Sequence, residues 1–312
     1  MFLLKKSFWK AFILWLIASL FFALTFILNR YMNRSWGSRL WTASLRFIFM
    51  LPILTFIVWI RWWLSDLLYH MKRNMKFWLR WSMVGFWLFY SFLCLSSEYG
   101  PWRLIASTRQ ITIVCWSLLI PFIYDSKYSI PWNSIVISCL ILFGIGVMQF
   151  NYFIWYDLRS MLSCIIFVSI AAIAYPLWNR KMMQISDDWL DVYQRVLWMT
   201  LASMPLWIIL SLIWWYLFWL PNNSQLLSSW IVAIGSWIIA TLLFFKSTDL
   251  TRTNMKELSI VEATQSWEVV FTFIAEIFFL WWVYPNIYSL SGIIIITIGM
   301  ILHSLSSYSH LE

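Results

Sequence analysis

The stretch LSIVEATQSWEVVFTFIAEIFFLWW, residues 258–282, is long and apolar enough to cross a bilayer as a helix. It nevertheless carries carboxylates in its interior, at Glu262 and Glu268. Three other apolar segments of this kind each hold one arginine, namely Arg46, Arg109 and Arg195. A charge inside a bilayer costs roughly 2.5 to 3.5 kcal/mol on insertion scales unless it meets a partner or a water-filled cavity. We therefore expect these charged residues to mark the functional pathway.

The composition excludes a soluble domain. The 312 residues are 62% hydrophobic, 21% aromatic and only 11% charged, and the mean hydropathy is +0.76. Apolar runs of helix length recur along the whole chain, which is typical of an all-α, polytopic membrane protein. The net charge is +9, but the Lys and Arg residues stand singly around apolar runs and form no basic stripe, so nucleic-acid binding is not indicated.

Ten apolar segments of about 20 residues are predicted to be transmembrane helices. They lie near residues 8–28, 40–60, 77–97, 101–121, 131–150, 159–179, 192–219, 227–245, 257–283 and 287–306. The first follows Lys5, Lys6 and Lys10, but no small-residue cleavage site comes after it, so we interpret it as a retained span. None of the separators is long enough to hold a soluble domain.

The basic residues predict the orientation of the chain. With the N-terminus inside, 14 of the 22 Lys and Arg lie at cytoplasmic ends: Lys5, Lys6, Lys10, Arg61, Lys72, Arg73, Lys76, Arg80, Lys127, Arg180, Lys181, Lys246, Arg252 and Lys256. Only Arg30, Arg34, Arg39 and Arg159 lie at the opposite ends. This bias follows the positive-inside rule and predicts that both termini of this multi-pass protein of the cell membrane are cytoplasmic.

The two halves of the chain resemble each other. The repeated positions are Asn29-Arg30 with Asn179-Arg180, Arg46 with Arg195, Gly85 with Gly235, and Gln110 with Gln265. We expect one transmembrane domain built from two five-helix repeats, residues 1–155 and 156–312. Because five spans is an odd number, the second repeat must be inverted relative to the first, an architecture typical of transporters.

On these residues the chain resembles the drug/metabolite transporter superfamily in its ten-helix, EamA-like form. The nearest branch is that of the multidrug resistance efflux transporters, and the resemblance covers nearly the whole chain. Its signals are two glutamates fourteen residues apart, Glu262 and Glu276, followed by Gly292 and Gly299, and Arg46 six residues before a proline.

The chain departs from the family pattern at one feature. Many relatives have proline directly after the first of these glutamates, where this chain has Ala263, and the matching position of the first half is Thr108. The resemblance implies a secondary carrier, and relatives carry drugs, amino acids, nucleotide sugars and other metabolites.

Two interpretations of the intramembrane carboxylates follow. Glu268 and Arg109 lie near the middle of repeat-related segments, so they are expected to pair and to hold two helices together. Glu262 has no evident partner on the same helix turn, which makes it the candidate for a carboxyl that exchanges a proton for substrate; the alternative is a solvated glutamate at a helix end. The repeat-related Gln110 and Gln265 complete the predicted coupling and substrate set.

The remaining charged and aromatic residues have structural interpretations. Arg46 and Arg195 are expected to snorkel to an interface or to pair between helices rather than to line a cavity, and Glu276 is expected to cap the outer helix ends. Most of the 26 Trp lie at span ends, as interfacial belts do. Trp267, between Gln265 and a glutamate, is the predicted substrate platform.

No metal, cofactor or nucleotide site is expected. The histidines His70, His303 and His310 are scattered, the four cysteines lie in apolar stretches without ligand spacing, and no Gly-rich phosphate loop is present.

The favoured function is a proton-coupled secondary carrier that exports lipophilic cations or small metabolites. The alternatives are a carrier of a zwitterionic or anionic metabolite, a membrane-bound lipid or sugar transferase using Asp187 and Asp188, and a channel, for which no acidic ring is seen.

Overall fold

The computed structural model describes residues 2–34, 39–61, 69, 75–96, 99, 102–119, 132–150, 157–185, 190–217, 220–280 and 286–308. Within these ranges every regular element is helical. The elements are α1 (Phe2–Arg34), α2 (Arg39–Arg61), α4 (Met75–Ser82), η1 (Met83–Leu88), α5 (Phe89–Ser96), α6 (Trp102–Thr108), α7 (Ile111–Leu118), α9 (Trp132–Met148), α11 (Leu158–Ile185), α12 (Val192–Leu217), α13 (Asn223–Val232), η2 (Ala233–Ala240), α14 (Thr241–Thr251), α15 (Met255–Ala263), η3 (Thr264–Ser266), α16 (Trp267–Leu280) and α17 (Ile287–Tyr308).

Six of the described helices are long and apolar enough to cross a membrane: Ser7–Leu28, Trp41–Arg61, Met75–Ser96, Leu158–Met182, Val192–Tyr216 and Asn223–Thr251. Two shorter apolar helices, Ile135–Met148 and Ile287–Leu302, accompany them. A helix satisfies its backbone hydrogen bonds within itself, which is what an apolar environment demands. The chain is therefore an all-helical, polytopic membrane protein, as its composition predicts.

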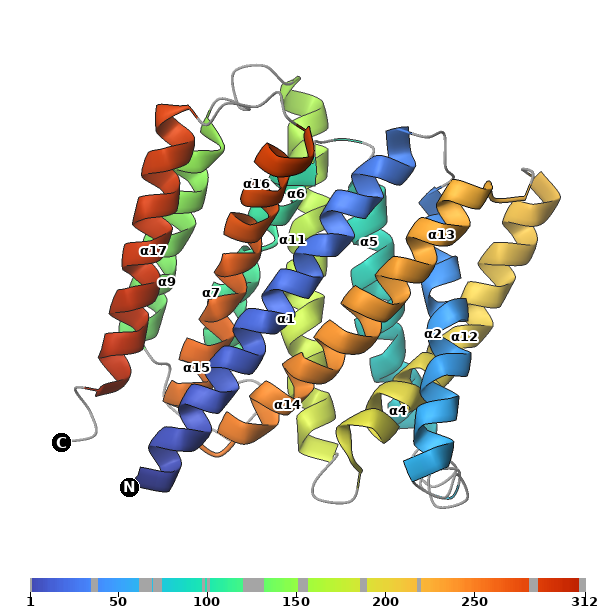
Figure 1. Ribbon diagram of the computed structural model, residues 1–312, viewed down its shortest axis with the longest axis horizontal. Coiled ribbons are helices and arrows are strands. Elements are labelled where there is room, and N and C mark those ends of the chain that lie inside the picture. The colour runs from blue at the N-terminus through green and yellow to red at the C-terminus, as the bar shows by residue number, and fades with distance from the viewer. Residues whose placement is uncertain are drawn as a thin grey trace.

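The helices stand side by side in one bundle (Figure 1). Helix α1 begins and α17 ends at the same end of the bundle, where α11 and α14 also end and α15 begins. Helices α9 and α17 pack on each other at one side. A Cβ atom on Gly292 of α17 would lie 2.5 Å from Cβ of Met148 and 2.6 Å from the carbonyl oxygen of Gly144. Only glycine permits this approach.

Two helical segments change their hydrogen-bond pattern at the two glycines that the sequence analysis pairs. Residues 83–88 and 233–240 form π-helical turns, and each turn contains one of the paired glycines, Gly85 and Gly235. Single π-helical turns inside α-helices are frequent at functional sites. These two turns face the same interior region, which is described below as a cavity.

Two other helices break, although neither break contains the proline that many relatives have. Helix α6 ends at Thr108 and α7 begins at Ile111, while α15 and α16 are joined by the 3₁₀ turn η3. Side chains donate further hydrogen bonds to carbonyl oxygens at the two breaks. The acceptors and their donors are Thr264 O from Ser19 Oγ (3.3 Å), Glu262 O from Trp15 Nε1 (3.3 Å), Arg109 O from Thr112 Oγ1 (2.6 Å) and Ala106 O from Gln110 Nε2 (3.1 Å).

The core is unusually aromatic. Phe47 stacks on Trp207 with ring centres 4.5 Å apart, and Trp15 packs on Phe244 at 4.3 Å. This main core joins α1, α2, α4, η1, α5, α6, α7, α11, α12, α13, η2, α14 and α15. A smaller core joins α7, α9, α15, α16 and α17. The broken helices lie between the two cores, which places their irregular backbone in the interior of the protein.

Candidate functional site

A narrow cavity lies where α1, η1, α5, α11, η2, α14 and α16 meet the break after α6. Nine aromatic side chains line it: Phe22, Phe26, Phe86, Phe89, Tyr90, Tyr175, Trp178, Trp237 and Phe244. Its polar lining includes Thr25, Ser236, Thr241, Arg109 and Glu268. The space open to the centre of a water molecule is about 30 Å³, enough for about two waters. In this structure the cavity is therefore too small for a drug-sized molecule.

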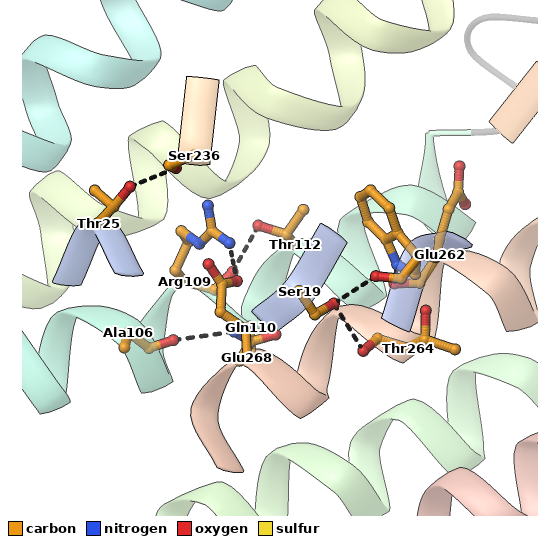
Figure 2. A network of polar contacts seen from close by, with 11 residues as sticks. Ser19, Thr25, Ala106, Arg109, Gln110, Thr112, Ser236, Glu262, Thr264 and Glu268 are labelled. Carbon is orange, nitrogen blue, oxygen red and sulfur yellow. Dashed lines mark hydrogen bonds and ion pairs between the residues drawn. The ribbon is translucent and has the colours of Figure 1, made fainter. Parts of the chain in front are cut away.

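Arg109 and Glu268 form an ion pair in this cavity. Figure 2 shows the guanidinium and the carboxylate facing each other, close to the contacts of Ser19 with Thr264 and of Thr25 with Ser236. Arg109 lies in the break between α6 and α7, and Glu268 lies in the first turn of α16, directly after the other break. The predicted pairing of these two residues is confirmed, and both side chains are buried.

The aromatic lining also surrounds the cation of this pair. The Cζ atom of Arg109 lies 5.5 Å from the ring centre of Phe26, 5.9 Å from that of Tyr175 and 6.0 Å from that of Phe22. Aromatic faces attract a cation at such distances, and the attraction grows when water is excluded. The cavity thus combines one carboxylate with walls that stabilise positive charge.

Glu262 is fully buried, so the alternative of a solvated glutamate at a helix end is wrong, and its partner lies on another helix and not on its own helix turn. Its Oε2 accepts a hydrogen bond of 2.6 Å from Nη2 of Arg180, and both side chains are fully buried. The charge pattern places Arg180 in a cytoplasmic connection, but α11 continues to Ile185 and carries Arg180 in its interior. The guanidinium also lies 5.2 Å from the ring centre of Trp116. The argument for placing the exchanged proton on Glu262 therefore loses its basis.

Arg195 pairs between helices, which is one of its two predicted alternatives. Its Nη2 and Nη1 donate to the two carboxylate oxygens of Asp249 at 2.7 and 3.2 Å. This two-pronged geometry is the strong form of an arginine–carboxylate contact. Asp249 is not among the predicted site residues. The predicted spans near 227–245 and 257–283 leave it in the connection between them, whereas α14 continues to Thr251.

Arg46 does not reach an interface, so the snorkelling alternative is wrong for it. Its side chain is fully buried, its Nε donates to the carbonyl oxygen of Thr42 at 2.9 Å, and its Cζ lies 4.2 Å from the ring centre of Tyr90. Tyr90 itself lines the cavity. Arg46 thus contacts a residue of the cavity wall without lining the cavity itself.

The predicted substrate platform does not lie at the cavity. Trp267 packs against the smaller core and against Phe271, with ring centres 5.8 Å apart, and the cavity wall does not include it. The two indoles that do line the cavity belong to Trp178 and Trp237. The sequence pattern does not identify these two indoles, because the helix face that points inward depends on the packing of the folded bundle.

The paired glutamines lie beside the two breaks. Gln110 and Gln265 are both buried, and Gln110 caps the end of α6. Within the described part of the chain the side-chain amide of Gln265 has no hydrogen-bond partner.

The side chain of Glu276 lies outside the described residues, as do Asp187, Asp188, His70 and His310. Among the residues that the structure describes, no group of three or more His, Cys, Asp or Glu could hold a metal ion.

Comparison with known proteins gives consistent results. Residues 9–309 match the family described as "Putative multidrug resistance efflux transporter". The chain is 46% identical over 308 residues to "Uncharacterized protein YjlA" of Bacillus subtilis (strain 168), a match that covers 96% of this chain and 95% of the relative. It is 41% identical over 266 residues to "Uncharacterized 42.1 kDa protein in intracellular alkaline protease 3'region" of Shouchella clausii, covering 83% and 70%.

One solved structure, described only as "Crystal structure of protein", is similar over 97% of both chains with a TM-score of 0.69. The sequences are 13% identical, so this likeness concerns the fold alone.

Proposed function

We propose that this chain is a secondary carrier that exports lipophilic cations in exchange for protons. The premise is that it belongs to the multidrug resistance efflux transporter family of the drug/metabolite transporter superfamily. The members of that family are membrane transporters and not enzymes. The observation that carries this proposal is the cavity in which aromatic walls surround the Arg109–Glu268 ion pair. Such walls favour a cation with an apolar body, and Glu268 supplies the negative charge.

Glu268 is the residue at which we place the exchange of proton and substrate. With Glu268 ionised and paired to Arg109, the site has no net charge. Binding one proton or one monovalent cation brings the site to the same charge of +1. The two loaded states are then electrostatically alike, and the two ligands compete for one carboxylate. Among the described residues that line the cavity, Glu268 is the only carboxylate.

Alternating access would come from ten spans arranged as two inverted repeats, residues 1–155 and 156–312, with both termini in the cytoplasm of the cell. The paired irregularities support this arrangement, because π-helical turns and helix breaks occur at corresponding places in both halves. Inverted repeats place the substrate site at the interface of the halves. Here elements of both halves line the cavity.

Two ion pairs, one fully buried and one partly exposed, are proposed to close the cavity on the cytoplasmic side. Arg180–Glu262 joins α11 to α15, and Arg195–Asp249 joins α12 to α14. The residues of both pairs lie toward the end of the bundle where α1 begins (Figure 1). Opening toward that end would require these helices to separate, so the pairs would hold the closed state.

Purified protein in liposomes tests this function. The liposomes are made acidic inside, the membrane potential is clamped, and tetraphenylphosphonium and ethidium are offered outside. We expect both permanently charged cations to accumulate only while the pH gradient lasts. Protein-free liposomes of the same composition are the control for passive uptake. Absence of accumulation by either cation would contradict the proposed substrate class.

A second substrate class is favoured by one specific observation. Arg109 and Glu268 present opposite charges side by side at the cavity, and Nε of Arg109 has no hydrogen-bond partner within the described part of the chain. A zwitterion such as an amino acid would bind both at once and leave the site neutral. Gradient-driven uptake of zwitterions and not of quaternary cations, in the same liposomes, would select this alternative.

A further inference from the structure

We propose that Trp178 sets the width of the cavity and that Gly85 is the positioning residue that holds its indole against the wall. Both residues line the cavity. The inference rests on the proposed function in one respect, because it takes the cavity as the place where substrate binds. It adds a residue that limits the size of the substrate.

The contact between Gly85 and Trp178 leaves no room for any side chain at position 85. A Cβ atom on Gly85 would lie 2.5 Å from Cδ2, 2.6 Å from Cγ and 2.8 Å from Cδ1 of Trp178. All three atoms belong to the five-membered ring of the indole. The ring therefore packs directly on the backbone of the π-helical turn η1, and glycine is what permits this.

Other aromatic rings fix the indole on its remaining sides. Phe86, Tyr175 and Phe245 lie with ring centres 5.9, 5.7 and 5.5 Å from that of Trp178, at interplanar angles of 87°, 80° and 72°. Packed interiors yield little, because their side chains already interlock. The space next to the indole that is not filled by protein is the cavity itself. A side chain at position 85 would push the indole into that space, which is small enough for a modest shift to fill it.

The chain provides two matched controls for a substitution of Gly85. Gly235 is its counterpart in the repeat and lies in the other π-helical turn. A Cβ there would lie 2.9 Å from Cδ2 of Leu24, the end of a flexible side chain, and in ordinary contact with Cδ1 of Phe21 at 3.6 Å. Gly146 in α9 has no neighbour within 4 Å of such a Cβ. Substituting alanine at each position gives the same intrinsic gain in helix propensity, so any difference reports the contact.

The positioning role is tested without any ligand by a double-mutant cycle. Gly85→Ala should lower the melting temperature of the purified protein by several degrees, while Gly235→Ala and Gly146→Ala should not. In a Trp178→Ala background, where the three clashing atoms are gone, Gly85→Ala should be neutral or stabilising. If Gly85→Ala alone fails to fold and the double variant folds, the contact is equally supported. An equal loss in both backgrounds would overturn it.

The size limit is tested by binding of three cations of increasing size: tetraethylammonium, tetrabutylammonium and tetraphenylphosphonium. Gly85→Ala should weaken binding of tetraphenylphosphonium by roughly tenfold or more, the scale of one methyl group in a closed pocket, and should affect tetraethylammonium least. Trp178→Ala should shift the preference toward the largest cation.

Equal weakening across the three cations would overturn the role of Trp178 as a size limit. If wild-type protein binds none of the three cations, the proposed function is contradicted, and with it the size limit for cations. The double-mutant cycle of Gly85 and Trp178 then still decides whether their contact positions the indole.

Discussion

Arg109, Arg180 and Arg195 each donate to a carboxylate on another helix, and the three pairs differ in their exposure to solvent. Both members of the Arg180–Glu262 pair are fully buried, whereas the side chain of Asp249 is 29% exposed. Removing one member of a buried pair leaves a charge without compensation, which typically costs about 3–5 kcal/mol. A partly exposed carboxylate keeps some of its hydration, so its pair should contribute less.

Exposure therefore predicts an order of stability effects. Arg180→Met should lower the free energy of unfolding by about 3 kcal/mol or more, and Arg195→Met should lower it by less. Thermal unfolding of the purified variants in one detergent measures both. A larger loss for Arg195→Met than for Arg180→Met would show that burial does not set the contribution of these pairs.

The pair in the cavity allows a separate test of contact. Arg109→Ala should destabilise the protein because it leaves the Glu268 carboxylate buried alone, and Glu268→Gln in the same chain should restore part of the loss, a coupling of about 0.5–3 kcal/mol. Protein yield and melting temperature of the two single variants and the double variant provide the cycle. Strictly additive effects would show that the two side chains do not interact.

At the residue scale, the sequence predicts that Arg109, Glu262 and Glu268 lie inside apolar segments, but it misses the burial of Arg180 and identifies only one of the ion-pair partners. The Arg109–Glu268 pair follows from equal depth in repeat-related segments. The partner of Glu262 is 82 positions away in the chain and lies beside a predicted helix end, so no local pattern connects the two. Helix ends predicted a few residues early leave Arg180 and Asp249 in expected connections, although both continue a helix.

At the scale of elements, helix pairs meet through positions where a side chain would not fit. A Cβ atom added to Gly292 would lie 2.6 and 2.7 Å from backbone atoms of α9, namely Gly144 O and the nitrogen of Met148. Backbone cannot rotate away as a side chain can. The α9–α17 contact should therefore tolerate no added methyl group on this face.

Gly292→Ala should destabilise the protein by about 1–3 kcal/mol, as overpacking of a filled interface does. Gly146→Ala on the same helix pair is the matched control, since nothing lies within 4 Å of its added carbon, and it should be neutral. Melting temperatures compare the two. Equal behaviour of the two variants would mean that α9 and α17 adjust their separation freely.

The helix breaks mark the limit of prediction at this scale. Apolar runs reveal the helical segments, but Thr108 and Ala263 give no breaking signal. The carbonyls near the break in the second half are satisfied from α1, by Ser19 and Trp15, which are about 245 positions away. Such long-range capping depends on the folded arrangement, so the sequence alone does not reveal it.

For the whole molecule, the orientation of the bundle is the property that the charge bias predicts. In a cysteine-free background, Lys76→Cys should react with a membrane-impermeant maleimide only from the cytoplasmic side, and Asn223→Cys only from the outside. Both positions are exposed. Labelling of both from the same side of intact cells would contradict the ten-span arrangement.

The central claim is that a cation and a proton compete for Glu268, and proton release on binding tests it most directly. Tetraphenylphosphonium is added to purified protein in weakly buffered detergent solution, over a range of pH, and the released protons are counted. We predict a maximum of about one proton per bound cation for wild-type protein, since one carboxylate serves both ligands. Release should persist in Glu268→Asp and Glu262→Gln and disappear in Glu268→Gln. Release that survives Glu268→Gln, or that is lost in Glu262→Gln alone, would contradict the account and assign the exchange to another carboxylate.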